Sequence, residues 1–89
     1  AVASVRRVVS ALPGYDLPKY HIDLSAEGGI VISFEAGDKY ADIECFNSGE
    51  VIAITSIRHE MPKTWLAETN DRLDKALVAI QSLFQGVGP

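Results

Sequence analysis

Cysteine and long apolar runs are what the sequence most clearly lacks. Its only cysteine is Cys45, so an internal disulfide and a cysteine-based zinc site are excluded, and a reducing compartment suits a lone thiol best. No apolar run comes near the ~20 residues of a membrane-spanning helix, and no charged-then-apolar leader opens the chain. We therefore expect a cytoplasmic protein with no membrane partner.

Basic residues are also in deficit, because 8 Lys and Arg stand against 12 Asp and Glu, for a net charge of −4. Nucleic-acid affinity depends on clustered Lys and Arg that release counterions, so we expect no nucleic-acid partner. That function would require distant cations to gather: Arg6, Arg7, Arg58, Lys63 and Arg72. Between Asp23 and Glu50 there are seven acidic residues and one basic residue, Lys39. This stretch favours a basic partner through long-range steering.

The chain of 89 residues, 47% of them hydrophobic and 22% charged, has the length and composition of one globular domain. At this length folding buries only a little over ~60% of the unfolded surface, which leaves no material for a second core. We expect a single domain over residues 1–89. Because the first residue is Ala1 and not Met, a processed product, a trimmed chain and a fragment of a longer protein all stay open.

Two short turns divide the stretch from Gly29 to Ile57 into three strand-like segments. The turns are Glu35-Ala36-Gly37-Asp38 and Asn47-Ser48-Gly49-Glu50. Each has Gly at its second central position, where a tight hairpin often needs positive φ, and each is flanked by alternating or solidly apolar residues. The pattern predicts an antiparallel meander.

If both hairpins have two-residue loops, alternation assigns each side chain to one face of the sheet. The expected core face carries Ile30, Ile32, Phe34, Ala41, Ile43, Cys45, Ile52 and Ile54. The expected outer face is acidic in the middle strand and apolar in the last one, and it carries Val31, Ser33, Glu35, Tyr40, Asp42, Glu44, Phe46, Val51, Ala53, Thr55 and Ile57. A three-residue loop with a bulge at Gly49 would shift the last strand by one position, so the faces of residues 51–57 stay open.

Two further elements are expected before the meander. Apolar residues recur at helical spacing from Val2 to Leu12, and Pro13-Gly14 follows, which predicts a short helix. Its β-branched residues leave a strand as the alternative. Residues 20–24 alternate with a period of two and predict an edge strand, because Asp23 and the preceding Pro18 would discourage pairing on the open side.

A long helix is expected at the other end of the chain. Thr64 is its expected N-cap, and Gly86 and Gly88 are expected to end it. One apolar stripe runs along it: Leu66, Leu73, Ala76, Leu77, Ile80 and Phe84. The predicted fold class is α+β, a two-layer sandwich in which an antiparallel three- or four-stranded meander is covered by N- and C-terminal helices, in the order α-β-β-β-β-α.

Few residues suggest chemistry. Asp42 and Glu44 share a strand face with Glu35 nearby, and paired carboxylates can serve acid/base catalysis or bind a hard cation, although antiparallel sheets usually have one solvated side. The histidines, His21 and His59, belong to no metal-binding motif. Cys45 falls on the core face, where a thiol behaves as a small hydrophobe. We expect no catalytic residue, no cofactor and no metal.

A more informative group surrounds the start of the predicted helix. Trp65 and Met61 could form an exposed apolar cluster with Phe46 and Val51, which would mark an interface, or Trp65 could simply cap the open end of the core. Together with the acidic strand face these side chains form the candidate interaction surface: Glu35, Tyr40, Asp42, Glu44, Phe46, His59, Met61 and Trp65.

The run Gly28-Gly29-Ile30-Val31-Ile32-Ser33-Phe34-Glu35 leads into the alternating Asp42-Ile43-Glu44 and the turn before Val51-Ile52. This third of the chain resembles the hairpin core of small uncharacterised bacterial proteins, in which a G-G-I-x-[IL]-x-[WF] strand precedes an alternating I-E strand and a second Gly turn. Phe34 stands where Trp is common. The resemblance implies a bacterial or phage-like origin and the meander, and it transfers no activity.

These observations favour a small non-enzymatic accessory domain that binds another protein or itself, possible roles being those of a chaperone, an immunity protein or a regulator, with a homodimer as one form. The alternative is a small-molecule or metal-binding protein that uses Glu35, Asp42, Glu44 and a histidine.

Overall fold

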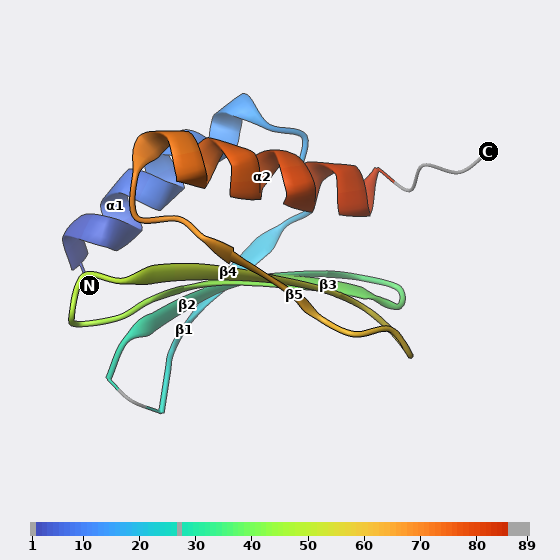
Figure 1. Cartoon of the computed structure of the whole chain (residues 1–89), viewed down its shortest axis with the longest axis horizontal. Helices are drawn as coiled ribbons and strands as arrows, with labels where there is room; N and C mark the ends of the chain where they lie inside the picture. The colour runs from blue at the N-terminus through green and yellow to red at the C-terminus, as the bar shows by residue number, and fades with distance from the viewer. Residues whose placement is uncertain (1, 27, 86–89) are drawn as a thin grey trace.

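The computed structural model describes residues 2–26 and 28–85. Helices α1 (Val2–Ala11) and α2 (Asn70–Phe84) lie on one side of a five-stranded antiparallel sheet (Figure 1). The strands are neighbours in chain order: β1 (Tyr20–Leu24), β2 (Ile30–Ala36), β3 (Lys39–Cys45), β4 (Val51–Ile57) and β5 (Lys63–Leu66). The predicted α+β class with terminal helices is confirmed, with a fifth strand added to the three or four expected. Within the described ranges, neither helix has the length and apolarity that crossing a membrane takes.

The fifth strand replaces the predicted start of the C-terminal helix. Residues 63–66 pair with β4, so the expected N-cap at Thr64 is wrong. Alternation in Lys-Thr-Trp-Leu, with two good strand formers, favours the strand. The helix instead begins after Thr69, whose Oγ1 accepts a hydrogen bond from the Arg72 amide at 3.1 Å. The predicted stop at Gly86 and Gly88 lies outside the described residues.

The first hairpin turns one residue later than predicted. Its loop is Gly37-Asp38, between the paired Ala36 and Lys39, and Gly37 has a φ of 62°. The resulting register differs from the predicted one by two residues, and an even shift leaves every side chain on its predicted face. Ile32 and Ile43 are accordingly opposite each other and fully buried.

The second hairpin has the bulged, three-residue loop. The Phe46 amide donates to the Glu50 carbonyl at 2.9 Å, the Gly49 amide donates to the Phe46 carbonyl at 3.0 Å, and Gly49 has a φ of 97°. Cys45 therefore pairs with Val51. This odd shift exchanges the two faces of β4 relative to the two-residue expectation.

The exchange corrects five assignments in β4. Val51 and Ala53 are fully buried beneath the helices, and Thr55 is nearly so. The expectation that Ile52 and Ile54 belong to the core face is wrong, because their registry with Glu44 and Asp42 places them on the outer face.

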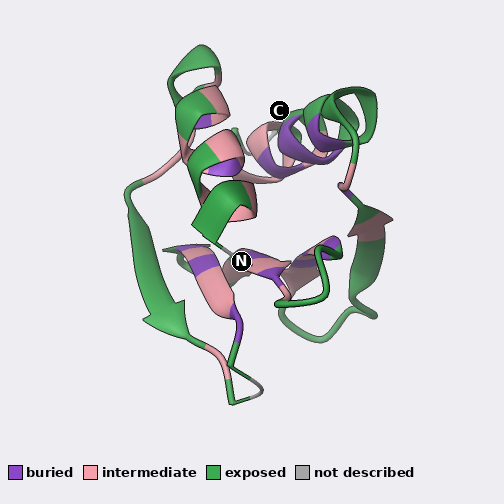
Figure 2. Cartoon of the chain, turned by 90° about the vertical axis from the view of Figure 1, so that its left-hand side faces the viewer, coloured by how far each residue is buried: buried purple, intermediate pink, exposed green. Residues whose placement is uncertain are grey.

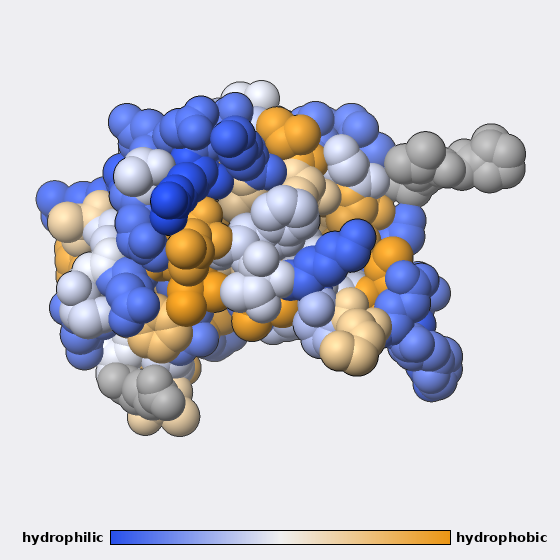
Figure 3. Space-filling model, viewed as in Figure 1, coloured by the Kyte–Doolittle hydropathy of each residue, from blue (hydrophilic) through white to orange (hydrophobic). Residues whose placement is uncertain are grey.

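The core lies between the helices and the inner face of the sheet. Buried residues line the inner sides of both helices and the central strands, whereas β1 is exposed along its whole length (Figure 2). The apolar stripe predicted for the C-terminal helix is confirmed in the buried Leu73, Ala76, Leu77 and Ile80. Leu66 was predicted in the same stripe, which is wrong, because it lies in β5 and is 50% exposed. In Figure 3, hydrophobic residues show through in the band between the helices and the sheet, and the turn between β4 and β5 is hydrophilic.

Candidate functional site

The outer face of the sheet is not covered by any described helix or strand (Figure 1). We call it the open face. The strand registers assign to it His21, Asp23, Val31, Ser33, Glu35, Tyr40, Asp42, Glu44, Ile52, Ile54, Ser56, Thr64 and Leu66. Four of these residues are acidic and none is Lys or Arg. The open face therefore attracts cations.

Asp42 occupies the middle of the open face, on the central strand. Ser33 lies opposite it on β2 and Ile54 on β4. Its Oδ2 accepts a hydrogen bond from the Tyr40 hydroxyl at 2.9 Å, while Oδ1 is buried and has no partner among the described residues. Burial raises the pKa of the Asp42 carboxyl and Glu44 raises it further, whereas the Tyr40 bond acts in the opposite direction.

Tyr40 is held in its neutral form beside this carboxylate. Burial, the hydrogen bond to Asp42 and the nearby carboxylates raise the pKa of Tyr40 to about 12. At neutral pH the hydroxyl is therefore a stable donor to Oδ2. Its donor capacity is used there, so Tyr40 does not serve Oδ1, which stays without a donor among the described residues.

An apolar row adjoins the acidic residues. Glu44 on β3 pairs with Ile52 on β4, which pairs with Leu66 on β5, so an acidic residue is followed by two aliphatic residues across the three strands. Ile52 and Ile54 are half-buried, and Leu66 is 50% exposed. A carboxylate with one free oxygen beside exposed aliphatic side chains can hold a partner that offers both an N–H cation and an apolar contact.

Half of the predicted interaction surface is found on the open face. It consists of Glu35, Tyr40, Asp42 and Glu44, on neighbouring strands. Sequence reasoning missed the aliphatic half, formed by Ile52, Ile54 and Leu66. The signal that could have found the first two was the Gly49 bulge, which sets the faces of β4.

The other four predicted residues lie elsewhere. Trp65 faces the helix side of β5 opposite Ala53, and its Nε1 donates to the Thr55 hydroxyl at 3.4 Å. Met61 is exposed and lines a hollow of about 330 Å³ with Trp65, between the β4–β5 edge and α2. The last two occupy turns: the half-buried Phe46 and the exposed His59. Val51, expected beside Trp65 on the outer face, is fully buried.

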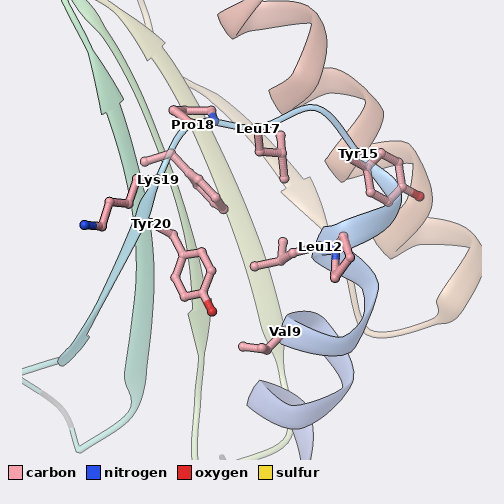
Figure 4. A pocket seen from close by; sticks show the side chains of 9 residues that line it. Val9, Leu12, Tyr15, Leu17, Pro18, Lys19 and Tyr20 are labelled. Atoms are coloured by element: carbon pink, nitrogen blue, oxygen red, sulfur yellow. The ribbon is translucent and has the colours of Figure 1, made fainter.

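A larger groove of about 660 Å³ opens between α1, the 3₁₀ turn Leu12–Gly14 and β1 (Figure 4). Its lining is mostly apolar. The amine of Lys19 points away from it, and the Tyr15 hydroxyl is directed outward to Asp74 on α2. Tyr20 is the remaining lining residue with a side-chain polar group. The groove thus presents little that would select a polar ligand.

Chemically reactive groups are not concentrated anywhere in the described part of the chain. Residues 2–26 and 28–85 contain no grouping of three His, Cys, Asp or Glu able to hold a metal ion. Cys45 is fully buried, and this burial raises the pKa of its thiol. An inert structural thiol fits both observations.

Comparisons of the chain with protein-family models, with curated proteins and with solved structures found no match. The hairpin resemblance to small bacterial proteins stays a prediction.

Proposed function

We propose that this chain is a protein-interaction domain whose open face binds a cationic and apolar segment of a partner protein. The observation that carries the proposal is the free, buried Oδ1 of Asp42 at the centre of an acidic face, next to the half-buried Ile54. Oδ1 is shielded from solvent and has no donor among the described residues, so a partner supplies one by moving the neighbouring side chains aside on binding.

The energetics favour a cation on the partner. A buried acceptor without a donor costs about 1–3 kcal/mol, and a bound N–H group recovers that cost. Hydrogen bonds between an ammonium or guanidinium group and a carboxylate are about twice as strong as neutral ones. Asp23, Glu35 and Glu44 reinforce the attraction at long range.

The apolar row supplies the second part of the contact. Burying aliphatic surface contributes about 25 cal/mol per Å², and Ile52, Ile54 and Leu66 present such surface without interruption by charge. A partner with a Lys or Arg next to an aliphatic side chain satisfies both halves. The alternative of a metal or small-molecule site at Glu35, Asp42 and Glu44 has no comparable support.

Isothermal titration calorimetry with a synthetic peptide of alternating arginine and leucine tests the proposal. The native chain is expected to bind it. Ile54→Lys is expected to weaken binding at least tenfold, because it adds a cation and removes aliphatic surface. A tenfold loss of affinity equals about 1.4 kcal/mol. Val78→Lys, on the exposed side of α2, is the matched control and is expected to bind as the native chain does.

Any of three results would overturn the proposal. The first is equal binding of a peptide of alternating glutamate and leucine, which would show that charge does not contribute to binding. The second is no loss of affinity in Ile54→Lys, and the third is no binding of the arginine peptide to the native chain.

A further inference from the structure

Strand β1 leaves apolar side chains in solvent on the side of the sheet where the helices lie. Tyr20, Ile22 and Leu24 share the face of the core residues Ile32 and Phe34, yet they are 38%, 50% and 82% exposed. Figure 2 shows the whole strand exposed at the margin of the sheet. The helix layer does not extend over it, so this margin has an apolar surface without a described covering.

No described strand pairs with the outer side of β1. The Ser25 amide donates to the Gly29 carbonyl at 2.9 Å. Ser25 and Gly29 therefore form a hydrogen-bonded pair, and such pairs alternate with non-hydrogen-bonded pairs along an antiparallel ladder. The next hydrogen-bonded pairs are those of Asp23 and His21, so these two residues direct their backbone groups toward β2. Residues 20, 22 and 24 therefore direct their N–H and C=O groups outward, where they can form a further ladder.

We propose that β1 pairs antiparallel with β1 of a second copy of this chain, centred on Ile22. Ile22 then lies opposite Ile22 of the second copy, and Tyr20 lies opposite its Leu24. These positions exchange the outward N–H and C=O groups. The exposed apolar side chains of both copies cover one another on the helix side.

Charge complementarity selects a second copy as the occupant. In this register His21 lies opposite Asp23 of the second copy, and the contact occurs twice. The two positions are non-hydrogen-bonded pairs, where side chains approach most closely, and an imidazole N–H can donate to the carboxylate. Asp23 deters pairing with an unrelated strand edge, but the crossed contact makes it compatible with this one.

The other margin of the sheet fits a copy less well. Strand β5 has four residues against the five of β1, and Pro62 precedes it directly, which removes a backbone donor at that end. Antiparallel pairing centred on Trp65 would place Lys63 against the Ala67 position of a second copy, without a charge partner.

The paired assembly adds to the proposed function without depending on it. A two-fold axis perpendicular to the sheet places both open faces on the same side, so the two five-stranded sheets become one. Two adjacent acidic faces would hold a partner that carries two cationic segments more tightly than one face does. The pairing itself involves only β1 and can be tested apart from the open face.

Sedimentation velocity over a range of protein concentrations tests the pairing. The native chain is expected to reach twice the mass of one chain. Ile22→Pro is expected to keep the mass of one chain, because proline removes an outward donor and no β1–β2 hydrogen bond. Thr64→Pro removes an outward donor from β5 and is the matched control, expected to pair as the native chain does.

A charge exchange provides a second test that leaves the backbone unchanged. His21→Asp places two carboxylates opposite each other and is expected to abolish the doubled mass, whereas His21→Asp combined with Asp23→His restores the crossed contact and the doubled mass. A native chain that keeps the mass of one chain up to its solubility limit would overturn the proposal. So would doubled mass in Ile22→Pro, or its loss in Thr64→Pro. Ile54→Lys, which is expected to weaken peptide binding to the open face, is expected to reach the doubled mass as the native chain does. Loss of pairing can therefore be distinguished from loss of binding at the open face.

Discussion

Asp42→Asn is expected to stabilise the folded chain at neutral pH. The native carboxylate is half-buried, one of its oxygens has no described partner, and Glu44 lies two residues away. Asparagine keeps a carbonyl oxygen for the Tyr40 hydroxyl and carries no charge. A buried acceptor without a donor costs about 1–3 kcal/mol. Because Asp42 is only half-buried and the new amide also needs a partner, we expect a gain of about 0.5–1 kcal/mol.

The gain is expected to depend on pH in a defined direction. Burial raises the folded-state pKa of Asp42 above the ordinary value of 3.8. Below 3.8 the carboxyl is neutral in both states, so the variant has no advantage there. As the pH rises through 3.8 and then through the folded-state pKa, the native chain loses stability that the variant retains. The advantage should therefore grow with pH and level off once Asp42 is ionised in the folded chain.

Urea unfolding followed by the fluorescence of Trp65, the only tryptophan, measures this difference at a series of pH values. A gain of 1 kcal/mol corresponds to about 4–8 °C in the melting temperature of a domain this small. Glu35→Gln, at an exposed position of the same face, is the matched control and should change little. Lower stability of Asp42→Asn at neutral pH, or a gain that does not vary with pH, would refute the reasoning. The same variant should bind the arginine peptide more weakly, as expected where a site trades stability for function.

Three further measurements probe the core and the helix start. Phe34→Ala should lower the free energy of unfolding by about 3–5 kcal/mol in urea titrations, because it empties a fully buried site between the rings of Tyr20 and Phe84; a loss below about 1 kcal/mol would contradict this packing. Thr69→Ala should cost about 1 kcal/mol through loss of the N-cap, whereas Thr69→Ser should cost less, and equal losses would argue against capping. The Cys45 thiol should react with a disulfide reagent only at the rate of unfolding, so rapid labelling of the folded chain would contradict its burial.

The sequence predicted most of the sheet because alternation is a local property. Ile32, Phe34, Ala41 and Ile43 were assigned correctly even though the first turn forms one residue later, since an even register shift preserves faces. Strand β5 was missed because four residues are too few to show a period, and a threonine before a leucine and an alanine also fits a helix start.

The candidate site was predictable to a smaller extent. Its acidic half follows from alternation in β3, but its aliphatic half depends on one extra loop residue at Gly49, which decides the faces of Ile52 and Ile54. The free Oδ1 of Asp42 depends on where the Tyr40 hydroxyl points. Such side-chain geometry arises from packing and is not encoded in residue spacing.

The most direct test of the open face is to map amide chemical shifts of the isotope-labelled chain while the arginine and leucine peptide is added. We predict that the largest shifts fall at Asp42, Ile54 and their cross-strand neighbours Ser33 and Thr64. Shifts centred instead on the groove beside Leu12 or on the outer side of α2 would contradict the claim that the open face is the binding surface.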